Sequence, residues 1–280
     1  MSEPEARVGA PFTVMGIVNV TPDSFSDGGS YLDPEAAIAH GLALVGEGAA
    51  ILDVGGESTR PGADPVPEAE ETTRVIPVIE GLAAALTAVP APVRISVDTS
   101  KFGVAAAAFA AGATLLNDVT ALRHAPELAG LAAQAGAQVC LVHMRGEPRT
   151  MQASPVYGDV VSEVKAFLEA RLAFTVAEGV PEERVILDPG IGFGKTVAHN
   201  LTLLRRCDEL LSLGRPILIG TSRKSFLGAL TGGRPPADRL AATIATNVIA
   251  YERGARIFRV HDVAPVHDAL TVTAATFAPD

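Results

Sequence analysis

The feature that most constrains the fold is an alternation, along the whole chain, of short apolar runs and longer alanine- and leucine-rich stretches. The runs are rich in β-branched residues, as buried strands are, and the stretches between them have helical spacing. Eight such runs occupy residues 13–20, 49–56, 93–99, 113–119, 137–143, 185–190, 216–222 and 256–262. Several helical stretches end in a glycine just before the next run, which is a typical helix stop, at Gly48, Gly112, Gly136, Gly179 and Gly254.

Continuously apolar strands that alternate with helices predict a parallel sheet covered on both faces. Eight strand–helix units in 280 residues fit an α/β fold of the (β/α)8 TIM-barrel type, which typically needs about 250 residues. A doubly wound open sheet is the alternative. No linker or low-complexity segment divides the chain, so we expect a single domain: an N-terminal tail at 1–12 and a barrel at 13–280.

Polar residues stand at the ends of nearly all the predicted strands, where an apolar core would not place them. They are Asn19; Glu57, Thr59 and Arg60; Asp98; Asn117 and Asp118; His143 and Arg145; Asp188; Ser222, Arg223 and Lys224; and Arg259 and His261. In a barrel the active site is built at the carboxyl ends of the strands, so we expect these side chains to converge on one site.

The residue types indicate which ligand such a site would take. Arg60, Lys224, Arg259 and His261 are cationic or nearly so in an acidic protein, which favours an anion such as phosphate. Asp98, Asn117 and Asp188 supply acceptors and an amide suited to a flat heterocycle rich in hydrogen-bond donors. The predicted ligand is therefore an anionic, phosphorylated compound with a nitrogen heterocycle.

Some residues allow more than one interpretation. Asp188, which precedes Pro-Gly, would also serve simply to start a turn, and Asp53, earlier in its strand, fits a structural carboxylate better than a ligand contact. His143 fits a wall of the site as well as a ligand contact. The run GIGFGKT at 190–196 resembles a phosphate-binding P-loop, but Pro189 occupies the position of the required first glycine.

Composition excludes several classes of function. The net charge of −10 argues against nucleic acid as the main partner, and every apolar stretch is too short to span a membrane. The acidic, polar N-terminus lacks the features of a signal peptide. Cys140 and Cys207 make neither a disulfide framework nor a metal motif, so we expect a reducing cytoplasm.

Seven motifs together resemble one family, the bacterial dihydropteroate synthases, which are the sulfonamide targets of folate biosynthesis. They are MGIVNVTPDSFSDGG, DVGGESTRPGA, SVDT, NDV, LDPGIGFGKT, GTSRKSFLG and RVHDV, in this order. The likeness runs from Val14 to the last predicted helix. It implies a TIM barrel that joins 7,8-dihydropterin-6-ylmethyl diphosphate to 4-aminobenzoate, releasing diphosphate and 7,8-dihydropteroate.

The resemblance also implies roles for residues at matching positions. Asn19 matches a Mg2+ ligand beside the diphosphate, and the diphosphate contacts match Thr59, Arg60, Arg259 and His261. Pterin recognition matches Asp98, Asn117, Asp188 and Lys224, with Arg259 against the ring. Ser225 matches the residue that meets the aminobenzoate carboxylate, and Phe25 and Pro61 match residues that wall the aminobenzoate.

The family mechanism that the resemblance implies is SN1-like: diphosphate departs first, and the arylamine attacks the cationic pterin methylene. Asp27 is our candidate for stabilising that cation, and Lys224, Arg259 and His261 complete the catalytic set. Two other functions remain open: a non-catalytic pterin-binding paralogue, and a pterin-dependent barrel that transfers methyl groups to a corrinoid protein. The family is usually homodimeric, so a homodimer is expected.

Overall fold

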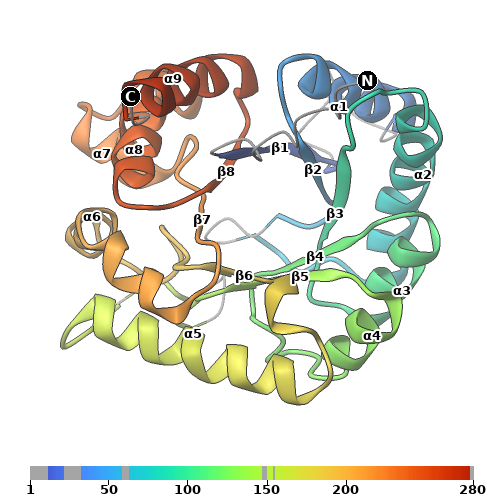
Figure 1. The fold of residues 1–280 in the computed structure, drawn as a ribbon, viewed down its shortest axis with the longest axis horizontal. Coiled ribbons are helices and arrows are strands. Elements are labelled where there is room, and N and C mark those ends of the chain that lie inside the picture. The colour runs from blue at the N-terminus through green and yellow to red at the C-terminus, as the bar shows by residue number, and fades with distance from the viewer. Residues whose placement is uncertain (1–11, 22–32, 59–62, 147–149, 154, 278–280) are drawn as a thin grey trace, which may run out of the picture.

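A computed structural model describes residues 12–21, 33–58, 63–146, 150–153 and 155–277 of the chain. Within these residues, eight parallel strands stand in the centre and helices surround them (Figure 1). The strands are β1 Thr13–Asn19, β2 Ile51–Gly55, β3 Arg94–Asp98, β4 Leu115–Asp118, β5 Gln138–Val142, β6 Val185–Asp188, β7 Leu218–Ile219 and β8 Ile257–Val260.

Helices connect the strands in regular alternation. The α-helices are α1 Pro34–Gly46, α2 Glu68–Leu86, α3 Phe102–Ala110, α4 Leu128–Ala135, α5 Val160–Ala177, α6 Val197–Arg205, α7 Ser225–Leu230, α8 Leu240–Glu252 and α9 Val263–Thr276. Three short 3-10 helices are η1 Glu182–Arg184, η2 Cys207–Leu213 and η3 Pro236–Asp238. These counts cover the described ranges only.

Local sequence signals explain where several helices begin and end. The side chain of Asp33 caps α1 by accepting from the Glu35 amide, and Pro34 follows it in the first turn. Gly136 ends α4 with φ of 63°, and the other four glycines predicted as helix stops also have positive φ. The predicted glycine stops are therefore confirmed.

The strands follow one another around a barrel in the order β6-β5-β4-β3-β2-β1-β8-β7. The barrel closes where β6 meets β7, through a single parallel bridge between Leu187 and Ile217. Here the Leu187 amide donates to the Pro216 carbonyl oxygen at 3.0 Å. The predicted single-domain (β/α)8 barrel is confirmed, although the seventh strand is shorter than the predicted run at 216–222. The alternative of an open doubly wound sheet is wrong.

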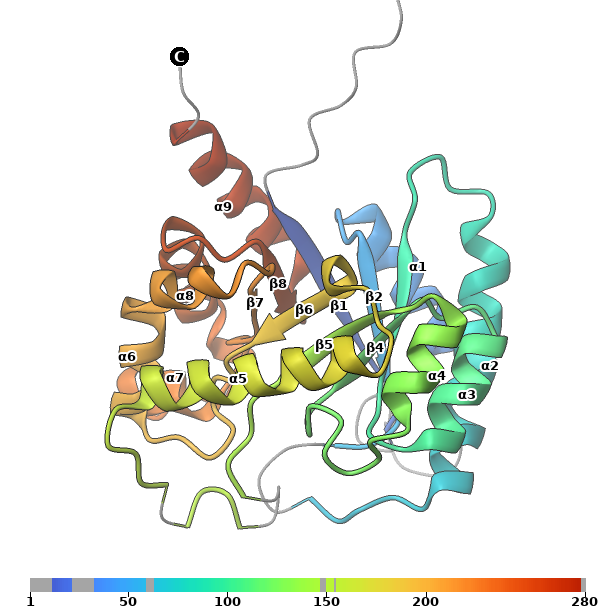
Figure 2. The ribbon, with the colours of Figure 1, turned by 60° about the horizontal axis from the view of Figure 1, so that its bottom comes forward.

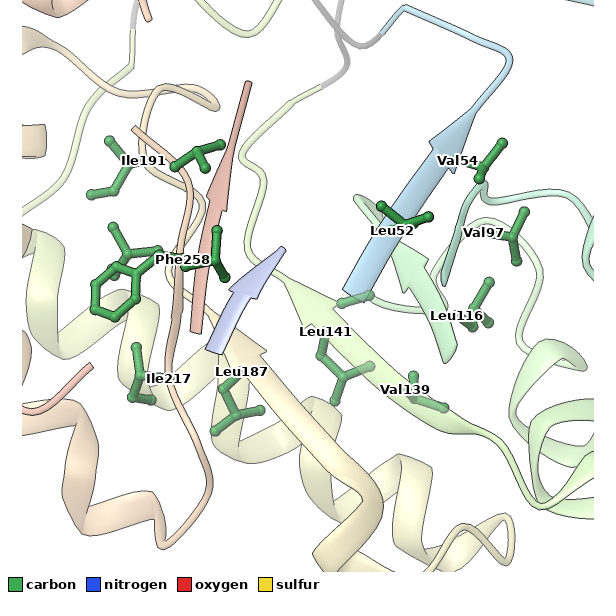
Figure 3. Packing of buried hydrophobic residues seen from close by; sticks show 14 of the residues in the cluster. Leu52, Val54, Val97, Leu116, Val139, Leu141, Leu187, Ile191, Ile217 and Phe258 are labelled. Carbon is green, nitrogen blue, oxygen red and sulfur yellow. The ribbon is translucent and has the colours of Figure 1, made fainter. Parts of the chain in front are cut away.

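Two separate layers of apolar side chains hold the barrel together. The larger layer lies between the sheet and the helices and includes Leu52, Val97, Leu141 and Phe258 (Figure 3). The smaller layer fills the barrel interior and contains Met15, Ile51, Leu115, Cys140, Val142, Ile186, Leu218 and Ile257. Because side chains alternate along a strand, residues two or four positions after an interior residue also face inward. This parity directs polar residues near the strand ends to the barrel interior.

The strand register places four strand-end positions, three of them polar, in one row across the sheet. Asn19 pairs with Gly55, Gly55 with Asp98, and Asp98 with Asn117. The described parts of the links from β2 to α2 and from β5 to α5 lie at the same end of the barrel (Figure 2). Among the described helices, none is both long and apolar enough to cross a bilayer.

Candidate active site

Arg259 on β8 lies between two carboxylates from β2 and β3, strands that do not neighbour β8 in the sheet. Its Nε donates to Asp53 Oδ2 at 2.5 Å, and its Nη2 donates to Asp98 Oδ2 at 2.7 Å. Asp53 is fully buried and the Arg259 side chain is only 22% exposed. The guanidinium therefore spans the interior between β8 and the β2–β3 pair, and its own position is fixed by both bonds.

Asn117 and Asp53 present two buried oxygen atoms that lack a protein partner among the described residues. Asn117 Nδ2 donates to Asp53 Oδ2 at 2.9 Å, so the amide oxygen must point away from that carboxylate. Neither Asn117 Oδ1 nor Asp53 Oδ1 has a hydrogen-bond partner within the described part of the chain. Because an unsatisfied buried acceptor is costly, a ligand with N–H donors would be stabilised here.

Asp188 and Lys224 occupy the neighbouring strand ends. Asp188, at the end of β6, is buried, and its Oδ1 accepts from the Gly190 amide at 2.6 Å. Lys224, which precedes α7, donates to the Ile191 carbonyl oxygen, and its Nζ lies 4.3 Å from the centre of the Phe193 ring. The loop after β6 thus holds both of these residues by its backbone and by one aromatic ring.

Burial changes the pKa values of these groups. It raises the pKa of Asp98 to about 7, although the Arg259 charge opposes the shift, and it raises the pKa of Asp188 against the charge of Lys224. Burial also lowers the pKa of Lys224 to about 8, against the charge of Asp188. For Arg259, burial works to lower the pKa, but Asp53 and Asp98 together hold it above its ordinary value.

The remaining predicted residues in the described ranges lie at the same end of the barrel. Ser222 Oγ accepts the backbone N–H of His261 at 3.1 Å and lies 2.9 Å from its Nδ1, which orients the ring. Asn19 is partly buried at the end of β1. Ser225 is exposed at the first position of α7.

Four strand-end residues turn away from the interior, and the first is Asp118, whose carboxylate accepts from the Thr120 and Leu122 amides of its own turn. The ring of His143 contacts Phe167 on α5, with ring centres 4.8 Å apart, which excludes His143 as an inward ligand contact. Arg145 pairs with Glu163 on α5 at 3.1 Å and lies over the Tyr157 ring. Arg223 is held by the Asp262 carboxylate. His143 follows the inward-facing Val142 directly, so strand parity sends it outward.

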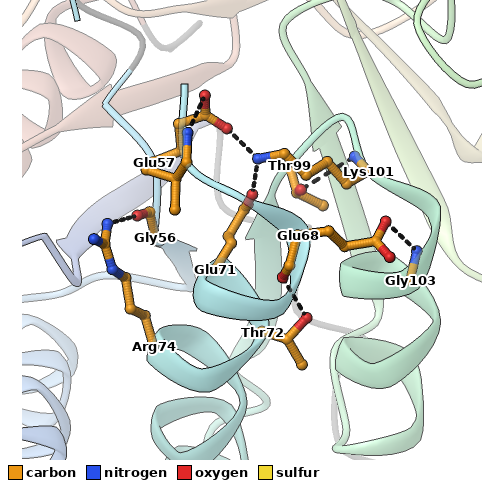
Figure 4. A network of polar contacts seen from close by, with 10 residues as sticks. Gly56, Glu57, Glu68, Glu71, Thr72, Arg74, Thr99, Lys101 and Gly103 are labelled. Atoms are coloured by element: carbon orange, nitrogen blue, oxygen red, sulfur yellow. Dashed lines mark hydrogen bonds and ion pairs between the residues drawn. The ribbon is translucent and has the colours of Figure 1, made fainter. Parts of the chain in front are cut away.

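A second polar cluster, which contains the predicted strand-end residue Glu57, joins the exit of β2 to α2 and α3 (Figure 4). Lys101 bridges the carboxylates of Glu57 and the fully buried Glu71. Glu57 Oε1 also accepts from the Val66 amide at 3.3 Å, and Arg74 donates to the Gly56 carbonyl oxygen at 2.7 Å. Both described ends of the β2–α2 link are therefore fixed to the helices.

Five predicted site residues lie outside the described residues, so their predicted roles stay predictions. They are Phe25, Asp27, Thr59, Arg60 and Pro61.

Comparisons with known proteins identify one family. The family model described as "Pterin binding enzyme" matches residues 15–261. The dihydropteroate synthase of Mycobacterium leprae is 47% identical, over 95% of this chain and 94% of its own length.

Solved structures of this family are similar to the chain in both fold and sequence. Xanthomonas albilineans dihydropteroate synthase with 4-aminobenzoic acid has a TM-score of 0.88 at 49% identity, covering 96% of this chain and 94% of that chain. The structure of the same enzyme in complex with 7,8-dihydropteroate has a TM-score of 0.85 at 47% identity, with coverage of 96% and 95%. The chain therefore belongs to the dihydropteroate synthase family of pterin-binding enzymes, which are transferases.

Proposed function

We propose that the chain joins 7,8-dihydropterin-6-ylmethyl diphosphate to 4-aminobenzoate at the carboxyl end of its barrel, yielding 7,8-dihydropteroate and diphosphate. The observation that carries this assignment is the pair of buried acceptors, Asp53 Oδ1 and Asn117 Oδ1, beside Asp98, which binds the same guanidinium as Asp53. A pterin ring carries N–H donors along one edge and would satisfy them. The solved X. albilineans complexes contain 4-aminobenzoic acid and 7,8-dihydropteroate, which supports both substrates.

Pterin recognition is proposed for Asp98, Asn117, Asp188 and Lys224. The Asp188 carboxylate meets the donor edge of the ring, and Lys224 supplies a donor on the same side. Arg259 lies against the ring face while Asp53 and Asp98 hold its guanidinium in place. These groups are oriented by protein contacts before the substrate arrives, which limits the entropy lost on binding.

The diphosphate is proposed to lie toward Arg259 and His261, with Thr59 and Arg60 as further contacts. In an SN1-like route the leaving group gains negative charge as its bond to the pterin methylene breaks. Cations and N–H donors that face this charge stabilise the transition state more than the bound substrate. Asp27 is proposed to stabilise the cationic methylene, and Phe25, Pro61 and Ser225 to hold the aminobenzoate.

Magnesium is proposed as the metal cofactor, with Asn19 as its protein ligand. The described residues contain no cluster of three or more histidine, cysteine, aspartate or glutamate side chains able to hold a metal. A single amide oxygen still suits Mg2+, because this ion retains several waters and takes oxygens from substrate phosphates. When bound, Mg2+ would neutralise charge on the departing diphosphate.

A homodimer and a cytoplasmic location are also proposed. Apolar side chains stand exposed on neighbouring helices α6, α7 and α8, at Leu201, Leu230 and Ile249. Sedimentation velocity tests the dimer, and a monomer at micromolar concentration would contradict it. Cys140 and Cys207 are buried thiols whose pKa burial raises, which suits a reducing compartment. Fractionation of the native cells tests the location, and recovery outside the cytoplasmic fraction would contradict it.

A coupled assay of diphosphate release tests the activity. Release that requires both substrates and Mg2+ is expected. Release without aminobenzoate would indicate hydrolysis, and no release at saturating Mg2+ would favour a non-catalytic pterin-binding paralogue. Methyl transfer to a corrinoid protein would instead favour the methyltransferase alternative.

A further inference from the structure

Lys195 closes the glycine-rich loop that links β6 to α6, and its side chain lies inside the protein. It is only 3% exposed. Its Nζ lies 2.9 Å from the Gly190 carbonyl oxygen, 3.1 Å from that of Phe193 and 3.3 Å from that of His143. The lysine of this P-loop-like run is therefore directed at the backbone around it.

His143 supplies a fourth acceptor. Its Nδ1 lies 2.8 Å from Lys195 Nζ, and we assign this hydrogen bond as Lys195 donating to an unprotonated Nδ1. Burial, together with the Lys195 charge, lowers the pKa of His143 to about 2, which keeps the imidazole neutral. We call Lys195 with the carbonyls of His143, Gly190 and Phe193 and the His143 ring the lysine cage.

The lysine cage fixes the loop against the end of β5. A Cβ on Gly190 would collide with the His143 carbonyl, and one on Gly194 with that of Arg145. Both glycines also have positive φ, so a side chain at either position would be strained. Close backbone contact and the buried Lys195 amino group thus hold the same segment.

That segment provides the contacts that orient two proposed pterin-binding residues. Its Gly190 amide donates to Asp188, its Ile191 carbonyl oxygen accepts from Lys224, and its Phe193 ring lies beneath the Lys224 ammonium. Lys195 bonds directly to the carbonyls of two of these three residues, Gly190 and Phe193. Loss of the buried donor would leave those carbonyls without it and release the loop.

We propose that Lys195 is a positioning residue of the synthase, which acts through the β6–α6 loop to orient Asp188 and Lys224 for the pterin. The inference rests on the proposed function. It assigns no contact between Lys195 and substrate.

Lys195→Met tests this role because it keeps a long side chain and removes the donors. The expected result is at least tenfold weaker calorimetric binding of 7,8-dihydropteroate. The alkaline limb of kcat/KM for the pterin diphosphate is also expected to move to higher pH, because Lys224 would lose some of the burial that lowers its pKa. Lys195→Gln, with a shorter neutral donor, should fall between Lys195→Met and the wild type.

Two control variants separate positioning from general stability. Lys165→Met removes another lysine, on α5, and Leu270→Ala makes a cavity under α9 in the outer apolar layer. Both should keep the dissociation constant and the pH profile, Leu270→Ala despite a lower Tm. If Lys195→Met behaves like Leu270→Ala, with lower stability but unchanged binding and pH profile, the inference is overturned.

A measurement on the wild type covers the case in which the Lys195 variants do not fold. Nitrogen-15 NMR of the histidine rings, with His143 assigned by His143→Gln, should show a neutral ring protonated at Nε2. Protonation at Nδ1 would overturn the inference. If wild-type protein fails to bind 7,8-dihydropteroate, the proposed function fails; if it binds and Lys195→Met binds equally well, only the positioning role fails.

Discussion

Arg259 and Asp98 meet across the interior of the barrel, with Nη2 and Oδ2 2.7 Å apart, although they stand on strands that are not neighbours in the sheet. Asp53 binds the same guanidinium from β2, where it lies two residues before Gly55, the partner of Asp98 in the sheet. A cation held by two carboxylates gives the polar end of the barrel a fixed arrangement. The proposed pterin site is built around it.

A bell-shaped pH dependence of kcat/KM for the pterin diphosphate follows from this arrangement. Below the Asp98 pKa of about 7 the carboxylate gains a proton and loses an acceptor, so the acid limb should lie there. Above the Lys224 pKa of about 8 the ammonium is lost, which gives the alkaline limb. Lys224→Arg stays charged, so it should lower the rate yet lose the alkaline limb. An alkaline limb that persists in this variant would contradict the assignment to Lys224.

The Lys101 cluster should contribute strongly to stability. Lys101→Met would leave the fully buried Glu71 carboxylate without its cation, which costs about 3 kcal/mol in the free energy of unfolding. The double variant Lys101→Met, Glu71→Leu removes both charges and should recover most of that loss. Urea unfolding of the single and double variants measures the coupling. Additive losses would show that the two side chains do not depend on each other.

Asn19 should govern the dependence on metal. Asn19→Ala removes the one proposed protein ligand, so the Mg2+ concentration that gives half-maximal activity should rise by about tenfold, the order expected when a ligand's support is lost. Asn19→Asp restores an oxygen ligand and is the matched control. An unchanged Mg2+ requirement in Asn19→Ala would place the metal elsewhere.

Phe25 is predicted to wall the aminobenzoate, and it lies outside the described residues. Phe25→Ala should raise the KM for 4-aminobenzoate more than the KM for the pterin diphosphate, because an apolar face against the aromatic ring is lost. Steady-state kinetics with each substrate varied in turn measures the difference. Equal effects on both KM values would count against this role.

Much of the fold follows from the sequence because periodicity is a local signal. The eight apolar runs each contribute a strand, and alternation along those strands places Asp98, Asn117, Asp188 and Arg259 at the inner face. The same alternation predicts that His143, which directly follows the inward-facing Val142, faces outward. The boundary of β7 was less predictable, since its pairing depends on where β6 and β8 lie.

The long-range contacts around the site could not be predicted from local sequence patterns. Nothing near Lys195 in the chain indicates that its amino group is buried against His143, 52 residues away. Lys101 likewise meets Glu57 and Glu71 only because β2, α2 and α3 are packed together. Such pairings arise from tertiary structure, whereas the residue types at strand ends are visible in the sequence.

If strand-end side chains from across the barrel form one pterin site, removal of the Asp188 carboxylate must weaken pterin binding. Calorimetric titration with 7,8-dihydropteroate should show one site per chain for the wild type. Asp188→Ala should bind at least tenfold more weakly, because the acceptor for the donor edge of the ring is gone, while the fold is retained by circular dichroism. Unchanged affinity in a folded Asp188→Ala variant would show that the pterin does not bind at these strand ends.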